Sequence, residues 1–231
     1  MQPTCVPTTP LPDSRTLRAR VLRDGWLKTT VAELGYDLDA AAEATAMLLG
    51  HPIEGRAGQA IEALAPQKQA SAKPRSLSVV HGLGSFPMHT DGAHRLQPPR
   101  FLVLVCASPG TSPVPTTLTR FGDLQISASE HASLEASPFL VRNGRRSFYS
   151  SICGRSRPFI RYDAGCMVPQ GAESEAMARL VARRARNASP TLVSWRSGDV
   201  LVIDNWNVLH GRGVGPAETS PDRKLLRASV Q

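Results

Sequence analysis

Two histidines and an aspartate in this 231-residue chain have the types and spacing of a metal site. In the segment FPMHTDG, His89 and Asp91 are two residues apart. On an extended strand their side chains would point to the same face, about 6.6 Å apart along the strand. His210, which ends the hairpin-like segment WRSGDVLVIDNWNVLH, is the best candidate for a third ligand. Two histidines and one carboxylate leave positions open on a non-haem iron(II) ion for a cosubstrate and oxygen.

Other functions use the same residue types. An His-x-Asp pair arises by chance in many chains, and three protein ligands plus a water also describe catalytic zinc. A zinc-dependent hydrolase and a non-catalytic, cupin-like small-molecule binding protein are therefore the alternatives. The arginines that follow His210, Arg223 and Arg227, favour the oxygenase, because the zinc interpretation gives them no role. A guanidinium binds a carboxylate through two parallel hydrogen bonds and stays charged at any working pH.

Taken together, these motifs are characteristic of one group of enzymes. HTDG at 89–92, GDVLVIDNWNVLHGR at 198–212 and RKLLR at 223–227 resemble the taurine dioxygenase and clavaminate synthase superfamily of iron(II)- and 2-oxoglutarate-dependent oxygenases. The resemblance runs from about residue 76 to residue 230. It implies a mainly β fold with flanking helices, a double-stranded β-helix or jelly roll, with the metal at its open end. It also implies an enzyme that uses Fe(II), 2-oxoglutarate and O2 to oxidise, by default hydroxylate, an unactivated C–H bond, with release of succinate and CO2.

The resemblance also assigns roles to individual residues. It makes His89, Asp91 and His210 the iron ligands. Arg223, thirteen residues after His210, is implied to bind the remote carboxylate of 2-oxoglutarate. Asp91 argues against a halogenase of the same superfamily, because halogenases replace the carboxylate ligand by a small residue.

Two further assignments concern the cosubstrate and the substrate. The resemblance implies that Thr117 helps to hold 2-oxoglutarate, with Thr116 as the off-by-one alternative, since TSPVPTT replaces the usual Gly-Gly-acidic-Thr turn. Arg227 falls on a position that in relatives often reaches an anionic group of the substrate. A small anionic substrate, such as an amino acid, another carboxylate or a sulfonate, is therefore expected, and we prefer a role in secondary-metabolite biosynthesis.

The sequence leaves two roles open for each of three further residues. Arg161 is expected to form a structural ion pair, with Asp163 or another carboxylate, or to line the pocket. Arg212 directly follows the third ligand motif, so it suits either the surroundings of the ligands or the cosubstrate. His81 is expected to be a surface or core histidine, with a substrate-facing position as the alternative.

The composition excludes several classes of protein. Hydrophobic residues make up 41% of the chain and charged residues 20%, which predicts one globular domain. The net charge of +8 comes from scattered arginines, which argues against a nucleic-acid partner. The longest apolar run, residues 101–107, is too short to span a membrane. The four cysteines lack metal or redox spacing, and no secretion signal is apparent, so we expect free thiols in the cytoplasm.

The remaining sequence must position the candidate site. We expect one domain over residues 1–231, with a helical preface and mobile loop at 1–75 and the jelly-roll core at 76–231. In the preface, residues 13–50 are expected to be helical, with a capping box at Thr30 and Glu33 and a left-handed turn at Gly50. Lid segments are expected to be reduced, so closure would depend on the 51–74 loop or on a partner subunit, which leaves a homo-oligomer open.

Short β-prone segments separated by turn residues fill the rest of the chain. Two helical segments, 128–136 and 173–186, interrupt them. The predicted strands are 76–83, 101–107, 147–153, 158–163, 191–195, 199–204 and 225–230.

Overall fold

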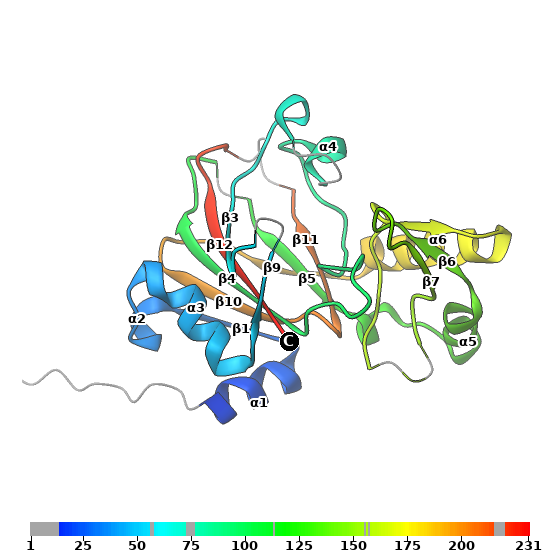
Figure 1. Ribbon diagram of the computed structural model, residues 1–231, viewed down its shortest axis with the longest axis horizontal. Coiled ribbons are helices and arrows are strands. Elements are labelled where there is room, and N and C mark those ends of the chain that lie inside the picture. Colours follow the sequence, from blue (N-terminus) through cyan, green and yellow to red (C-terminus); the bar gives the residue numbers. More distant parts are fainter. Residues whose placement is uncertain are drawn as a thin grey trace, which may run out of the picture.

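The longest apolar run of the sequence forms a central strand of a six-stranded sheet (Figure 1). The computed structural model describes residues 14–55, 58–72, 77–112, 114–154, 156, 158–214 and 220–231. The strand order is β1-β10-β4-β12-β2, β3 also pairs with β12, and every pair is antiparallel. The strands are β1 (Trp26–Thr30), β2 (Pro52–Ile53), β3 (Ile61–Leu64), β4 (Phe101–Ser108), β10 (Asp199–Asp204) and β12 (Lys224–Val230).

Both faces of this main sheet are covered, which explains why β4 and the middle of β10 are apolar. The odd-numbered residues of β4 from Phe101 to Val105 pack with helices α1 (Ser14–Asp24) and α3 (Leu38–Leu49). The even-numbered residues of β4, beginning with Leu102, pack against residues of a second sheet. Figure 1 shows α1, α2 (Val31–Leu34) and α3 together on one side of the main sheet. The fold therefore has three layers: the helices, the main sheet and the second sheet.

The second sheet carries one of the candidate histidines. Its order is β11-β5-β9, with β5 (Thr116–Arg120), β9 (Thr191–Val193) and β11 (Val208–Arg212). The segment that contains His89 runs along the free side of β11. The backbone N–H of Phe86 donates to the carbonyl oxygen of Arg212 (2.9 Å), and His89 and His210 exchange two backbone hydrogen bonds of 2.9 and 3.0 Å.

A third sheet and two helices lie on the right of Figure 1. Their buried residues form a separate apolar cluster. Leu209 of β11 and Met88 pack into this cluster, so it supports the strand segments that carry both candidate histidines. The third sheet has the order β7-β6-β8. Its elements are β6 (Phe139–Val141), β7 (Phe148–Ser150), β8 (Met167–Pro169), α5 (Ala128–Ala136) and α6 (Ala172–Asn187), preceded by the 3-10 helix η2 (Phe121–Leu124).

Many predicted elements are confirmed. The strands at 101–107, 147–153, 191–195, 199–204 and 225–230 correspond to β4, β7, β9, β10 and β12, and the two predicted helices correspond to α5 and α6. The capping box of Thr30 and Glu33 is present. No helix in the described ranges is long and apolar enough to cross a membrane. Among the described cysteines, Cys106, Cys153 and Cys166 are free thiols, and Cys5 lies outside the described residues.

Several expectations for the first part of the chain are wrong. The 51–74 segment contains β2, β3 and the 3-10 helix η1 (Gln69–Ser71), because β12 offers a pairing edge that no local pattern reveals. Residues 26–30 form β1 against β10, so the main sheet includes strands from before residue 76. Gly50 has φ 160°, which is extended rather than left-handed. A Cβ atom there would lie 2.3 Å from the carbonyl oxygen of Gln231, so this glycine permits a close approach of the C-terminus.

Two predicted strands are also wrong. Residues 78–81 form helix α4 (Ser78–His81), which ends at Gly82 with φ 51°, a backbone conformation that glycine adopts readily. The described part of 158–163 forms no strand. Its backbone N–H groups donate to different segments: Ile160 to the carbonyl oxygen of Trp206, and Arg161 to that of Ile152.

Candidate functional site

The imidazoles of His89 and His210 lie side by side between neighbouring strand segments. Paired residues of an antiparallel bridge point to the same face, and the two ring centroids are 4.6 Å apart. His89 Nδ1 lies 2.9 Å from the carbonyl oxygen of Pro87. A carbonyl can only accept, so Nδ1 carries the proton and the Nε2 lone pair of His89 is left for another partner.

The Asp91 carboxylate is held ionised close to these histidines. Arg227 Nη1 donates to Asp91 Oδ2 at 2.5 Å, and the backbone N–H of Gly92 donates to Oδ1 at 3.0 Å. Burial alone would raise the pKa of Asp91, but the positive charge of Arg227 outweighs burial and holds this pKa well below its usual range. The site therefore contains a carboxylate that keeps its charge.

His210 is held in its neutral form. Burial, followed by the nearby His89, lowers the pKa of His210 to about 3. Its Nδ1 is buried and has no hydrogen-bond partner among the described residues. A neutral imidazole is the form that binds metals. Within the described ranges, however, no three His, Cys, Asp or Glu side chains are grouped closely enough to hold a metal ion. The two imidazoles are together, while the Asp91 carboxylate is engaged by Arg227.

Asn205 fixes the backbone of Asp91, a role that the sequence did not reveal. Its side-chain Oδ1 accepts from the Asp91 N–H at 2.9 Å, and its Nδ2 donates to the Asp91 carbonyl oxygen at 3.0 Å and to that of Pro99 at 2.8 Å. Only 1% of Asn205 is exposed. It ties the turn between β10 and β11 to the His-x-Asp segment.

Two neighbouring arginines form a positive region at the end of β11. Arg212 donates from Nε to the carbonyl oxygen of Gly84 (2.7 Å) and from Nη2 to that of Gly82 (2.5 Å), with its guanidinium 3.7 Å from the centre of the Phe86 ring. Burial, followed by the charge of Arg223, lowers the pKa of Arg212 to about 10. The structure thus gives Arg212 a structural role beside the site.

Arg223 is buried without a counter-ion. It is 5% exposed, and its guanidinium forms no hydrogen bond or ion pair with the described part of the chain. Burial lowers the pKa of Arg223, and the Cys106 thiol partly opposes this effect. A buried, unpaired cation is costly, so an anion from outside the chain is its natural partner.

Arg227 differs from Arg223 because both of its terminal nitrogens have carboxylate partners. Nη1 donates to Asp91, and Nη2 donates to Glu62 Oε2 at 2.5 Å. The expected contact of Arg227 with an anionic substrate group stays a prediction. In this structure Arg227 holds the Asp91 carboxylate.

The sequence model of the family described as taurine catabolism dioxygenase TauD, TfdA family matches residues 114–229. The chain belongs to this family. The match covers β5, β11, His210 and both site arginines, whereas His89 and Asp91 lie before it. No curated protein sequence matches the chain.

Solved structures show the same fold as this TauD/TfdA family member. Asparagine oxygenase AsnO has a TM-score of 0.74 and 19% identity over 94% of this chain and 77% of that chain. PvcB from Pseudomonas aeruginosa has a TM-score of 0.68 and 19% identity over 94% of this chain and 80% of that one. The non-heme iron oxygenase OrfP, solved with Fe and alpha-ketoglutaric acid, has a TM-score of 0.68 and 20% identity over 94% and 79%.

The strand register corrects the threonine expected to hold the cosubstrate in this family member. Thr116 pairs with Arg212 and Thr117 with Gly211, so Thr116 shares the face of Arg212 and His210. Thr117 points to the opposite face, where its hydroxyl contacts the sulfur of Met88 at 3.6 Å. The Thr116 hydroxyl accepts from Trp195 Nε1 at 3.0 Å, which leaves its own proton to donate. The off-by-one alternative, Thr116, is therefore the better candidate.

The structure also shows the contacts of Arg161 and His81, for which the sequence left two roles open. Arg161 is fully buried and donates to backbone carbonyl oxygens of Ala93, Arg95 (2.5 Å) and Leu96 (2.8 Å), so it braces the loop after Asp91. His81 lies against Phe86, with ring centroids 5.8 Å apart, and burial followed by the charge of Arg212 lowers the pKa of His81.

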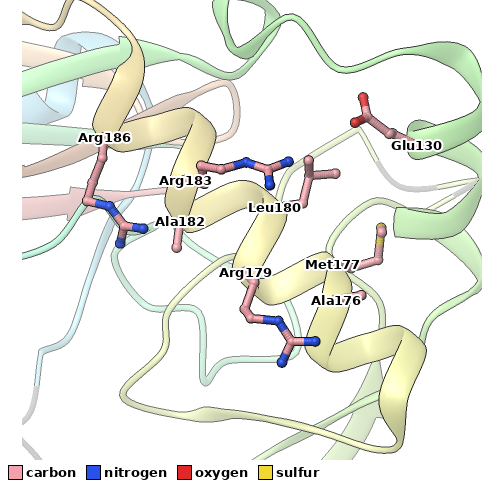
Figure 2. A pocket seen from close by; sticks show the side chains of 8 residues that line it. All are labelled: Glu130, Ala176, Met177, Arg179, Leu180, Ala182, Arg183 and Arg186. Carbon is pink, nitrogen blue, oxygen red and sulfur yellow. The ribbon is translucent and has the colours of Figure 1, made fainter.

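A hollow on helix α6 lies apart from this site. Figure 2 shows arginine side chains of α6 spread along it, with one acidic residue facing them from α5. None of the lining residues belongs to the candidate site, and we assign the hollow no role. It is lined by Glu130, Ala176, Met177, Arg179, Leu180, Ala182, Arg183 and Arg186.

Proposed function

We propose that this TauD/TfdA family member is an Fe(II)- and 2-oxoglutarate-dependent oxygenase with a double-stranded β-helix core. The observation that carries the proposal is the buried Arg223 guanidinium, which has no counter-ion among the described residues and lies close enough to Arg212, on the strand of His210, to lower the pKa of that arginine. A zinc hydrolase or a degraded binding protein needs no such cation. An oxygenase needs it to bind the remote carboxylate of 2-oxoglutarate.

The types and protonation states of the donors suit iron(II), although the three described side chains would have to move closer together to bind it. His89 has an Nε2 lone pair left over, His210 is neutral with an unpartnered buried Nδ1, and Asp91 is ionised. We propose that these three residues hold the metal, which with 2-oxoglutarate and O2 supplies the oxidising power to hydroxylate a C–H bond. Arg227 binds Asp91 Oδ2 and so orients the carboxylate. Arg227 and the metal would therefore share the Asp91 carboxylate.

Several residues of the chain would bind 2-oxoglutarate or shape its surroundings. Arg223 would bind the remote carboxylate, and the hydroxyl group of Thr116, which shares a face with Arg212 and His210, would donate a further hydrogen bond. Arg212 fixes the 82–86 segment over this end of the sheets and adds positive charge. Strand pairing on both sides of β11 excludes water from the backbone around His210.

We propose a small-molecule substrate and a cytoplasmic location, the latter because the described cysteines are thiols. Solved relatives include AsnO with 2S,3S-3-hydroxyasparagine and succinate, and OrfP with (3S)-hydroxy-L-Arg. PvcB is described as part of an isonitrile synthetic pathway. These relatives support hydroxylation of an amino-acid-like molecule in a biosynthetic setting.

Succinate release by the wild-type protein tests the proposal. The purified protein with Fe(II), 2-oxoglutarate and air is expected to form succinate slowly even without a substrate, because these oxygenases turn over 2-oxoglutarate in an uncoupled reaction. Replacing Fe(II) by Zn(II), or air by argon, should stop the reaction. Succinate formation that persists with zinc, or that is absent from folded protein with iron, would refute the oxygenase.

Loss of the Asn205 side chain is expected to weaken metal binding. Asn205→Leu keeps the approximate size but removes three hydrogen bonds that fix Asp91 and the neighbouring loop. Removing groups that orient a metal ligand typically costs about 10- to 100-fold in affinity. We expect this loss in an anaerobic Fe(II) titration. Asn207→Leu in the same turn, which breaks one bond to Asp204, is the matched control and should bind Fe(II) like the wild type. Equal affinities in both variants would contradict the role of Asn205.

A further inference from the structure

The Asp91 carboxylate has a partner from the chain on each of its oxygens. The backbone N–H of Gly92 donates to Oδ1 at 3.0 Å, and Arg227 Nη1 donates to Oδ2 at 2.5 Å. The side chains of Arg227 and Asp91 are only 19% and 21% exposed, so dissolved ions screen this ion pair weakly. Arg227 is thus a cation that Asp91 contacts directly and strongly.

The backbone is fixed on both sides of this ion pair. Arg227 lies in β12 between Leu104 of β4 and Glu62 of β3, so paired strands hold it from both sides. Its second terminal nitrogen, Nη2, donates to Glu62 Oε2 at 2.5 Å. The backbone N–H and carbonyl oxygen of Asp91 are both bonded to the buried Asn205 side chain. Only the side chains can therefore adjust when a further cation approaches Asp91.

A metal bound by Asp91 and the two histidines would disturb the contact with Arg227. The ring centroids of His89 and His210 are 4.6 Å apart, but no three candidate ligands among the described residues are grouped closely enough to bind a metal. The Asp91 carboxylate would have to turn toward the imidazoles, while Arg227 is held by its strand and by Glu62. Two cations that share one carboxylate repel each other, so each binds it less tightly than it would alone.

We propose that Arg227 regulates metal binding: it serves as an internal cation for Asp91 and thereby lowers the affinity of the site for the metal. The inference rests on the proposed oxygenase function, in which Asp91 is a metal ligand. It separates Arg227 from Asn205, which holds the Asp91 backbone and does not contact the carboxylate. Arg227 is a positioning residue whose loss should destabilise the metal-free protein and yet strengthen metal binding.

Arg227→Met tests this inference through two changes of opposite sign. Methionine keeps an apolar stem but removes the cation that the largely buried Asp91 carboxylate contacts. After treatment with a chelator, the variant should unfold about 5 °C or more below the wild type, because breaking a buried ion pair is strongly destabilising. In an anaerobic Fe(II) titration without 2-oxoglutarate, the variant should bind the metal at least about tenfold more tightly than the wild type, since the competing charged hydrogen bond is gone.

Three further variants control the experiment. Arg196→Met removes one positive charge from an exposed turn and should match the wild type in both measurements. Adding His210→Ala to Arg227→Met should abolish the tighter binding if the metal lies at the histidine pair. If Arg227→Met fails to fold, Arg227→Gln, which also removes the charge, is measured for the same opposite changes.

The results separate this inference from the proposed function. Unchanged or weaker Fe(II) binding by a folded Arg227 variant would overturn the inference, and weaker binding would show that Arg227 only orients the ligand. Failure of both Arg227 variants to fold would make the residue structural and would overturn the inference as well. In each of these cases, Fe(II) binding by the wild type that is lost in His210→Ala would leave the oxygenase intact. A folded wild type that binds no Fe(II) would reject both the inference and the proposed metal site.

Discussion

Arg223→Met is expected to abolish 2-oxoglutarate binding while leaving the ligand-free protein as stable as the wild type or more stable. The guanidinium is buried and has no hydrogen bond or ion pair with the described chain. Each lost charge-assisted hydrogen bond to the cosubstrate costs about 1.5–3 kcal/mol, so loss of a bidentate contact should weaken binding by roughly 100-fold or more. Methionine removes the unpaired charge and keeps an apolar stem, a change that can stabilise a protein by up to about 4 kcal/mol.

Two measurements on the same variant check this expectation. Calorimetric titration with 2-oxoglutarate and Zn(II) gives the affinity, and thermal unfolding with and without 2-oxoglutarate gives the stability. The wild type should gain stability from the ligand, whereas Arg223→Met should not. Arg196→Met, at an exposed turn arginine, is the matched control and should keep wild-type binding. A variant that binds 2-oxoglutarate normally would show that another cation, such as Arg212, holds the cosubstrate.

Local patterns predicted the elements whose stability is largely local. The apolar run of β4 and the periodic helix α6 follow directly from the sequence because each buries a continuous apolar surface. The two candidate histidines were also found from the sequence, and the structure brings them into contact. Their role as metal ligands, with Asp91, stays a prediction.

Features that depend on long-range register could not be predicted from local patterns. β3 exists because β12 offers it an edge, and only this pairing places Glu62 against Arg227. The choice between Thr116 and Thr117 depends on a one-residue register with β11, since one step along a strand turns a side chain to the other face. Asn205 reaches across 114 residues of sequence to hold Asp91, a contact that no spacing rule reveals.

His210→Ala is expected to cause the largest loss of metal binding and to stop succinate formation. The imidazole is neutral at any pH well above about 3 and stands beside His89, so its removal takes away one of the proposed nitrogen ligands. Loss of a group that only orients a metal ligand lowers metal affinity by about 10- to 100-fold. Loss of the ligand itself should therefore lower metal affinity on the order of 100-fold or more. The backbone hydrogen bonds of β11 do not require the side chain, so the variant should fold, with a modest loss of stability.

Anaerobic Fe(II) titration and far-UV circular dichroism provide the test, with His131→Ala, a surface histidine of α5, as the control. A folded His210→Ala protein that still binds Fe(II) and releases succinate would move the metal site away from this histidine pair, and the proposed function would have to be rebuilt around other residues.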